Sequence, residues 1–495
     1  MPPPKERTAI KVQAERAVLA AVRLPESRFD PADPFGELRE LAAQAGAVVV
    51  GEIEQRRERP EAGTYMGRGK VDELRGLCET LNAKTIVFDH ELSPKQIAAI
   101  ERITERKVLD RSELILDIFA SRATTREAKL QVELAQLEYT FPRLRAMWDH
   151  LERIVGSGGI GGVGTRGPGE QQLEIDRRLV QRRKKLLETE LNQIRERKRR
   201  QVEQRNVDHF TVGLVGYTNA GKSTLFNTLT AGGAYADDRV FATLMTRTRE
   251  WDLKGVGPEG AGGGLTAMLS DTVGFVRDLP HHLVASFRAT LEEATHANLL
   301  LIVLDAADPA AQLHLETVRS TLEEVFDEVQ HAEERAAKKS EHTGATVDRW
   351  TPPECVLVLN KADKLADNRE LLIWKQREPD AIAISALHDA EDPHRLSLGH
   401  DELVARVRKA AMGAPRLLDV TIPLSDSRTV HVIENRGTVI DRTYNGETVT
   451  LRAEIGERQI AQLRSAGARM TLTPVGDDAM PIDEPAPAWK PPSEA

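Results

Sequence analysis

Apolar and polar residues alternate with two different periods along the first quarter of the chain. Residues 71–81 and 93–103 carry apolar side chains at helical spacing, and Ser93 followed by Pro94 is typical of a helix start. Alternation of such helices with strands predicts a small α/β domain with a largely parallel sheet, over residues 16–125. The short apolar runs that are typical of its strands occur at residues 17–24, 47–54, 85–89 and 107–110.

The next part of the chain has the pattern of two packed helices. Apolar residues first recur at alternating spacings of four and three, at Leu130, Leu134, Leu137, Phe141, Leu144, Trp148 and Leu151. A second series follows at spacings of seven, at Leu173, Val180, Leu187 and Ile194. Between the two series, residues 156–169 include eight glycines. The pattern predicts a helical hairpin over residues 126–207, with a glycine-rich tip at 156–169.

Strands and helices alternate again over residues 208–413, which predicts a second α/β domain. Within it, residues 331–354 are charged and contain prolines, so we expect a surface excursion there. The two ends, 1–15 and 476–495, are Pro-rich or polar and are predicted to be disordered. A last α/β unit is predicted over residues 416–475, with strands at 419–424, 438–444 and 447–455.

The composition excludes several classes of protein. A length of 495 residues indicates about three domains, and 40% apolar with 29% charged residues is ordinary for a soluble protein. The longest apolar run, 299–304, is far shorter than the ~20 residues of a membrane span. The N-terminus lacks the apolar core of a signal peptide, and the two cysteines, Cys78 and Cys355, exclude a disulfide framework. We therefore expect a cytoplasmic protein, with peripheral membrane association left open.

Charge is unevenly distributed. The net charge is −9, yet residues 176–205 hold twelve Lys or Arg and five Asp or Glu, a local balance of +7 that leaves −16 for the rest. A basic segment on an acidic body is compatible with a specific polyanion contact. A solvated helix face explains the same charges equally well.

The strongest chemical signal is a phosphate-binding loop. An apolar strand from Phe210 leads into GYTNAGKS (216–223), and a helix follows. Glycines let backbone N–H groups curve around phosphate oxygens, and the helix N-terminus favours negative charge. Lys222 is placed to bridge the β- and γ-phosphates, and the Ser223 hydroxyl to ligate Mg²⁺. A purely structural glycine turn is the weaker alternative.

A second motif selects the base. The apolar strand 356–360 ends in Asn360-Lys361-Ala362-Asp363. The Asp363 carboxylate can accept from guanine N1–H and the 2-amino group, donors that adenine lacks. The Lys361 stem can cover the base and Asn360 can reach N7. Alone the motif is weak, but after a phosphate loop it predicts GTP. The backbone near Ser385 and Ala386 can meet guanine O6.

Residues between these motifs are expected to hold Mg²⁺ and to sense the γ-phosphate. Asp271, at a strand end, can hold the Mg²⁺ shell through water, and the Gly274 N–H can contact the γ-phosphate. Thr243 is the expected switch threonine, a second Mg²⁺ ligand, with an ordinary loop threonine as the alternative. The predicted catalytic residues are Lys222, Thr243 and Gly274. The predicted GTP-binding residues are Gly216, Tyr217, Thr218, Asn219, Ala220, Gly221, Lys222, Ser223, Thr224, Phe241, Ala242, Thr243, Leu244, Met245, Asp271, Thr272, Val273, Gly274, Asn360, Lys361, Ala362, Asp363, Ser385, Ala386 and Leu387.

Phe275 stands where Ras-like enzymes carry a water-orienting glutamine. A phenyl ring cannot orient water by hydrogen bonding, so hydrolysis must be slow alone or be completed from elsewhere. Asn219 offers one candidate, because loops of the form GxxNAGKS help to bind K⁺ in some GTPases, and K⁺ can neutralise developing charge. The alternative is that Asn219 only stabilises the turn. The histidines show no metal-ligand spacing, so no further metal is expected.

With these motifs the sequence resembles the HflX family of ribosome-associated GTPases, in the Obg–HflX group. The first three of the segments that carry the resemblance are not general GTPase features. The segments are MGRGKVDEL (66–74), DRSELILDIFASRATTREAKLQVELAQLEY (110–139), GGVGTRGPGEQQLEIDRR (161–178), GYTNAGKSTLFN (216–227) and DTVGF (271–275).

The resemblance implies an N-terminal α/β domain with a helical hairpin, a P-loop GTPase domain and a small C-terminal domain. It implies a factor that binds the large ribosomal subunit and splits or rescues stalled ribosomes under stress. A monomer is expected. The hairpin residues implied to contact ribosomal RNA are Gly161, Thr165, Arg166, Gly167, Pro168, Gly169, Arg177 and Arg178.

One departure from the family pattern bears on catalysis. The switch segment usually reads FATLDPTTR, whereas here it reads FATLMTRTR, which puts the switch geometry and the hydrolysis rate in doubt but not nucleotide binding. Two functions therefore stay open: a slow GTPase stimulated by ribosomes, and a nucleotide-gated assembly or anti-association module with little turnover. Hydrolysis of ATP by the N-terminal domain is a third, weaker option, because no phosphate loop occurs in residues 1–125.

Overall fold

The computed structural model describes most of the chain. The described residues are 15–25, 27, 29–156, 168–230, 247–253, 265–277, 294–340, 350–365, 367–392, 394–413, 415–436, 438–457, 460, 463–464 and 468–475. The predicted disorder of residues 1–14 and 476–495, and most of the glycine-rich tip, lie outside the described residues.

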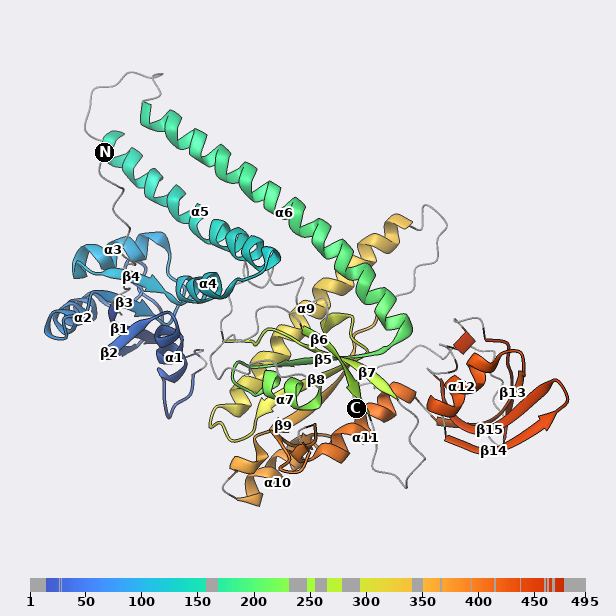
Figure 1. The fold of residues 1–495 in the computed structure, drawn as a ribbon. Coiled ribbons are helices and arrows are strands. Elements are labelled where there is room, and N and C mark those ends of the chain that lie inside the picture. The colour runs from blue at the N-terminus through green and yellow to red at the C-terminus, as the bar shows by residue number, and fades with distance from the viewer. Residues whose placement is uncertain are drawn as a thin grey trace, which may run out of the picture. The chain divides into compact units, whose positions relative to one another are not determined.

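The N-terminal part contains a four-stranded parallel sheet with the order β2-β1-β3-β4 (Figure 1). Its strands are β1 (Glu15–Arg23), β2 (Ala47–Arg56), β3 (Thr85–Phe88) and β4 (Lys107–Asp110). Its helices are α1 (Gly36–Gln44), α2 (Arg68–Thr80), α3 (Pro94–Thr104) and α4 (Arg111–Arg122). Ser93 caps α3 in a capping box with Gln96, which explains why this helix begins at Pro94. The predicted parallel α/β organisation is therefore confirmed.

Helices cover both faces of this sheet, and strand β1 shows why. Its seven residues from Ala17 to Arg23 are all buried, as expected for a central parallel strand. Leu19 packs in one core with side chains of α1, α4 and α5, whereas Val18 packs in the opposite core with side chains of α2 and α3. Alternate residues of one strand thus face two separate helical layers.

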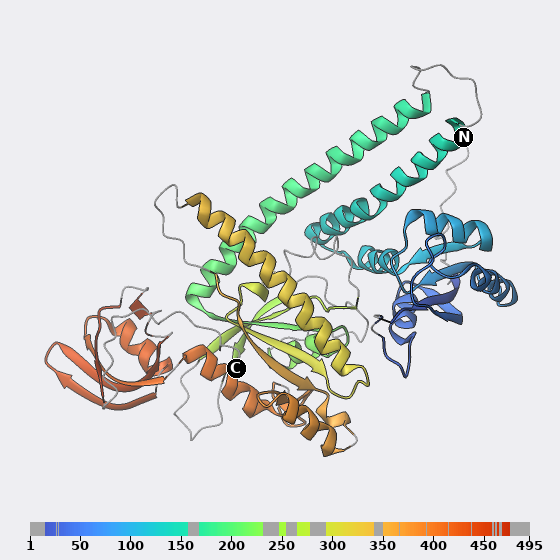
Figure 2. The same cartoon turned by 180° about the vertical axis from the view of Figure 1, so that it is seen from behind.

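The predicted helical hairpin consists of α5 (Arg126–Gly156) and α6 (Pro168–Asp208), which run side by side in Figures 1 and 2. Leu130 and Leu134 of α5 pack against Leu187 and Leu191 of α6. Ion pairs add to this contact: Arg183 pairs with Glu133 at 2.6 Å, Lys184 with Glu138 at 2.9 Å and Lys198 with Glu127 at 2.8 Å. The hairpin is therefore held by an apolar seam and by charges that cross between the helices.

A six-stranded sheet with the order β10-β9-β8-β5-β7-β6 carries the phosphate loop. Its strands are β5 (Phe210–Gly216), β6 (Arg247–Asp252), β7 (Thr266–Asp271), β8 (Leu299–Asp305), β9 (Glu354–Asn360) and β10 (Ile382–Ala383). The central pairs β5–β8 and β8–β9 are parallel, so their carboxyl ends meet at one edge. This edge is where an open α/β sheet binds ligands.

Three helices and one 3₁₀ turn accompany this sheet among the described residues. They are α7 (Lys222–Leu229), α9 (Ala311–Ser340), the 3₁₀ turn η2 (Ala362–Lys364) and α10 (Asn368–Arg377). The first part of the expected surface excursion at 331–354 continues α9 to Ser340, and its described side chains, such as His331 and Arg335, are exposed. The sequence HAEERAAKKS is rich in Ala, Glu and Lys, which favour helix.

The C-terminal part is an antiparallel sheet with one helix. The sheet has the order β14-β15-β13-β16, with β13 (Pro415–Pro423), β14 (Thr438–Asn445), β15 (Thr448–Gly456) and β16 (Thr471–Pro474). Helix α12 (Ser427–Arg436) packs Ile433 into the same core as Val420 and Leu451. In the sequence, three elements precede β13: the short strands β11 (Ser385–His388) and β12 (Leu396–Leu398), and helix α11 (His400–Met412). Among the described residues, every helix is too short or too polar to cross a membrane.

Candidate functional site

The phosphate loop follows β5, where backbone geometry demands glycine at two positions. Gly216 has φ +154°, and a Cβ there would stand 2.2 Å from the carbonyl oxygen of Val303. Gly221 has φ +91°, and a Cβ there would stand 2.2 Å from Nδ2 of Asn360. Neither site can accept a side chain without displacing a neighbour, so these glycines allow the loop to curve beside the adjacent strand and the second motif.

Lys222 begins α7 and is buried inside the loop. Its Nζ donates to the carbonyls of Gly216 at 3.0 Å and Tyr217 at 2.6 Å. Burial lowers the pKa of this lysine from 10.5 to about 8, and Asp271 only partly opposes that shift. A buried lysine at the centre of a loop of N–H groups suits a polyphosphate, whose negative charge would favour the charged form of the lysine.

Two oxygen-bearing side chains meet at the start of α7. The Ser223 hydroxyl donates to Oδ2 of Asp271 at 2.8 Å, and Asp271 is only 1% exposed. A hydroxyl and a carboxylate are the kinds of oxygen donor that Mg²⁺ prefers. The two residues that the sequence assigned to Mg²⁺ are therefore brought together. The third, Thr243, lies outside the described residues, as do Phe241, Ala242, Leu244 and Met245.

The base-selecting motif is connected directly to the phosphate loop. Nδ2 of Asn360 donates to the carbonyl of Ala220 at 2.7 Å, and its Oδ1 accepts from the N–H of Ala386 at 2.9 Å. Asn360 is 1% exposed, so its amide joins three chain segments that are far apart in sequence. This bridging role was missed by the sequence analysis, which considered only contact with N7. Asp363 is exposed in η2, accessible to a ligand.

The segment after β7 runs alongside the phosphate loop. Phe275 donates its N–H to the carbonyl of Gly216 at 3.0 Å, and its carbonyl accepts from the N–H of Thr218 at 2.8 Å. A Cβ on Gly274 would stand 2.9 Å from Cγ2 of Thr218 and 3.0 Å from Nζ of Lys222. Gly274 thus lies where the sequence places it, next to the lysine expected to bind the γ-phosphate.

The implied ribosome contacts are described only in part. Gly161, Thr165, Arg166 and Gly167 lie outside the described residues. Pro168 and Gly169 begin α6, and Arg177 and Arg178 are exposed on the same helix.

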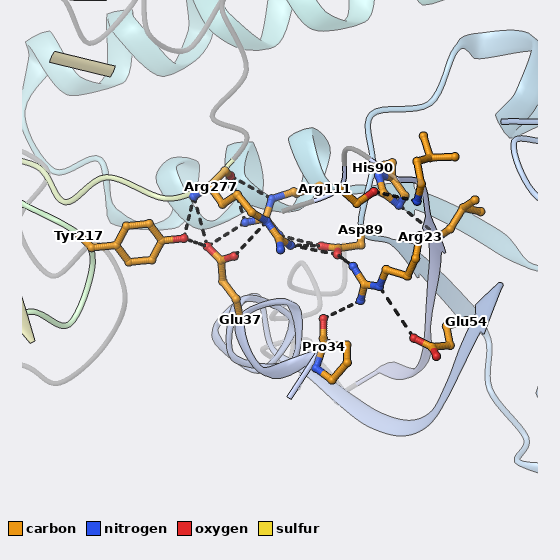
Figure 3. Close-up of polar contacts among 12 residues, drawn as sticks. Arg23, Pro34, Glu37, Glu54, Asp89, His90, Arg111, Tyr217 and Arg277 are labelled. Atoms are coloured by element: carbon orange, nitrogen blue, oxygen red, sulfur yellow. Dashed lines mark hydrogen bonds and ion pairs between the residues drawn. The ribbon is translucent and has the colours of Figure 1, made fainter. Parts of the chain in front are cut away.

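A set of charged residues next to the phosphate loop could not be predicted from the sequence. Tyr217 donates its hydroxyl to Glu37 of α1 at 2.5 Å, and Arg277 forms ion pairs with Asp89 at 3.0 Å (Figure 3). No motif or periodicity in the sequence points to these pairs, because the partners are separated by 180 and 188 residues.

Comparison with known proteins is consistent with this geometry. Three family models match the chain: GTP-binding GTPase N-terminal at residues 33–120, GTP-binding GTPase Middle Region at 122–205, and 50S ribosome-binding GTPase at 211–361. GTPase HflX of Escherichia coli is 44% identical over 404 residues, 81% of this chain and 86% of that protein. GTPase HflX of Magnetococcus marinus is 37% identical over 453 residues, 91% of this chain and 94% of that protein.

Among solved structures, a GTP-binding protein from the archaeon Sulfolobus solfataricus in complex with GDP aligns with 80% of this chain and 98% of its own. Its sequence identity is 23% and the TM-score is 0.37.

Proposed function

Because this chain belongs to the HflX family of GTPases, we propose that its GTP form binds the large ribosomal subunit and splits or rescues stalled ribosomes under stress. The observation that carries this proposal is the match of residues 211–361 to the family described as 50S ribosome-binding GTPase. GTP hydrolysis then releases the factor. As a GTPase, the chain cycles between GTP and GDP, and the ribosome is the proposed activator.

The exposed cations of α6 support a contact with RNA. Among the described residues of α6, Arg183, Lys184 and Lys198 form ion pairs with carboxylates of α5. Arg177, Arg182, Lys185 and Arg197 are also exposed on α6. A helix with this density of exposed positive charge on an acidic protein suits the phosphate backbone of ribosomal RNA, and such binding weakens steeply with salt.

The roles proposed for the site follow from its geometry. Lys222 would neutralise charge on the β- and γ-phosphates, and the N–H of Gly274 would bind a γ-phosphate oxygen. Ser223 and Asp271 would hold Mg²⁺, which supplies charge neutralisation between the β- and γ-phosphates when bound. Phe275 has no group that can orient water, so we propose that the ribosome completes the catalytic site.

A nucleotide-gated binding module with little turnover is the second candidate. It is favoured by the 3% exposure of Phe275, which places an apolar, buried side chain at the position of a catalytic glutamine. In that case GTP would control assembly or subunit association by binding alone.

Turnover of GTP with and without purified large ribosomal subunits tests the proposal. We expect strong stimulation by large subunits that falls as salt is raised, and no stimulation by small subunits, which serve as the control. Binding of GTP with equally low turnover in all three mixtures would instead support the gated module.

A further inference from the structure

Asp89, the first residue after β3, is the centre of a buried ionic cluster. Its carboxylate accepts from Arg23 at 2.9 Å, from Arg111 at 2.8 Å and from Arg277 at 3.0 Å (Figure 3). Arg23 and Arg111 belong to the N-terminal domain, whereas Arg277 follows the segment that lies along the phosphate loop. The Asp89 and Arg111 side chains are only 1% and 2% exposed, so these ion pairs are shielded from water.

Both backbone polar groups of Arg277 are also held by side chains. Its N–H donates to the Tyr217 hydroxyl at 2.8 Å, and its carbonyl accepts from the Arg111 guanidinium at 3.1 and 3.2 Å. The Tyr217 hydroxyl in turn donates to Glu37 of α1 at 2.5 Å, and Glu37 pairs with Arg111 at 2.8 Å. The main chain at residue 277 is therefore fixed by groups from the phosphate loop and the N-terminal domain together.

Apolar contacts hold the preceding residues in the same way. Val273 and Val276 are 7% and 1% exposed, and both pack in the N-terminal core with residues such as Leu19 and Phe119. Phe275, between them, packs instead in the core of the GTPase domain. The segment 273–277 is thus shared between two cores, and a shift of its backbone must disturb both.

The charges of the cluster allow Arg277 to leave. Burial by itself would raise the pKa of Glu37 and of Asp89, but Arg111 and Arg277 together lower both, so the two carboxyls are ionised. Without Arg277, two carboxylates would still face Arg23 and Arg111. Departure of the segment therefore leaves Asp89 paired with Arg23 and Arg111, and Glu37 paired with Arg111.

The position of the segment matters because it lies directly beside Lys222, the residue expected to bind the γ-phosphate. Even a Cβ on Gly274 would be within 3.0 Å of the Lys222 Nζ and 2.9 Å of the Thr218 side chain. A phosphate oxygen bound by both Lys222 and the Gly274 N–H requires about 2.8 Å to each donor. Because Gly274 lies this close to Lys222 and Thr218, GTP is expected to displace Gly274 and strain the contacts of residues 273–277, whereas GDP, which has no γ-phosphate, is not.

We propose that Glu37, Tyr217 and Arg277 are positioning residues that set the preference of the site for GDP over GTP, with the N-terminal domain holding residues 273–277 against the phosphate loop. This inference deepens the GTPase function and is independent of ribosome binding. By linkage, GTP must loosen the contacts of Arg277 to the same extent that these contacts oppose GTP.

Equilibrium binding of a non-hydrolysable GTP analogue and of GDP to the full-length protein tests the proposal without ribosomes. Tyr217→Phe removes only the hydroxyl that links Glu37 to Arg277, and Glu37→Gln removes one charge of the cluster. Loss of one buried hydrogen bond corresponds to about a five-fold change. Glu37→Gln should therefore bind the analogue about five-fold more tightly relative to GDP, and Tyr217→Phe, which loses two hydrogen bonds, at least as much. Matched controls are Tyr444→Phe and Glu73→Gln, whose side chains are exposed.

A second variant pair separates positioning from stability. Arg277→Lys keeps a cation but loses the forked guanidinium, so its preference should lie between those of the wild type and Arg277→Ala. If Arg277→Ala does not fold, the ratio of affinities for the analogue and GDP measured with Tyr217→Phe tests the proposal alone. An unchanged ratio of affinities, or an equal loss for both nucleotides, would overturn the proposal. Failure of the ribosome to stimulate turnover would leave it intact, because the ratio is measured without ribosomes.

Discussion

The N–H of Phe275 donates to the carbonyl of Gly216 at 3.0 Å, while the phenyl ring is 3% exposed in the core of the GTPase domain. The side chain of the residue after DTVG thus lies in apolar surroundings. Its side chain packs the domain, and this explains why an aromatic residue can replace the water-orienting glutamine of Ras-like enzymes at this position.

Phe275→Gln is therefore expected to destabilise the fold rather than to accelerate GTP hydrolysis. The change removes a buried ring and places an amide in an apolar core, at a cost of about 3 kcal/mol. Urea unfolding should show the loss, and basal GTP turnover should not rise. The exposed residue Leu372 is a control, since Leu372→Gln should cost little. A stable variant with faster turnover would contradict this account.

The burial of Lys222 should make the stability of the nucleotide-free protein depend on pH. Its pKa is lowered by burial from 10.5 to about 8, so between these values the unfolded chain binds a proton that the folded chain lacks. The contribution of Lys222 to the free energy of unfolding should therefore rise with pH from 8 to 10.5, and should be at its most unfavourable below pH 8. Urea unfolding at pH 7.5 and 9.5, compared with Lys222→Met, measures this difference. Parallel curves for the two proteins would refute the assignment.

The phosphate loop, the guanine motif and most strands of the N-terminal sheet could be predicted because they are local. A glycine loop between a strand and a helix, or alternation along five residues, is present in the sequence itself. Two contacts could not be predicted from the sequence: the bridge from Asn360 to Ala220 and the ion pair of Arg277 with Asp89. Each joins residues that only the tertiary fold brings together. Helix α1 was not predicted for a different reason: the helix, Gly36–Gln44, is short and begins without a side-chain cap.

Asp363→Asn should weaken guanine recognition. The carboxylate is expected to accept two N–H groups of guanine, and loss of charged hydrogen bonds corresponds to about a ten- to hundred-fold loss of GTP affinity. An amide can donate to the 2-oxo group of xanthine, so the variant should gain affinity for xanthosine triphosphate. Competition between the two nucleotides measures the change. Asp327→Asn, at an exposed position on α9, is the control, and equal base preference in both variants would exclude this role.

Asn219 is expected to make turnover depend on K⁺. Its Nδ2 donates to Glu40 of α1, so its Oδ1 remains oriented away from that carboxylate and can serve as a cation ligand. GTP turnover should be faster in K⁺ than in Na⁺ at equal ionic strength, and Asn219→Ala should abolish the difference. If Asn219 only stabilises the turn, the variant will lower turnover by the same factor in both salts.

Deletion of residues 158–169 is expected to separate the two activities of the protein. The base of the hairpin does not need this segment, because Leu130 and Leu134 pack against Leu187 and Leu191, and Arg183 pairs with Glu133. The phosphate loop and the guanine motif are likewise held by contacts that do not involve the tip. Intrinsic GTP turnover should therefore stay within about two-fold of the wild type, since none of these contacts involves the deleted segment. Stimulation by large ribosomal subunits should be lost, as the resemblance places the ribosome contact at the tip.

Charge reversal at the exposed Arg182 and Lys185 of α6 should instead weaken subunit binding and reduce its salt dependence, without abolishing stimulation at low salt. A deletion variant that loses basal turnover would mean that the tip supports folding, and one that is still fully stimulated would place the ribosome contact elsewhere.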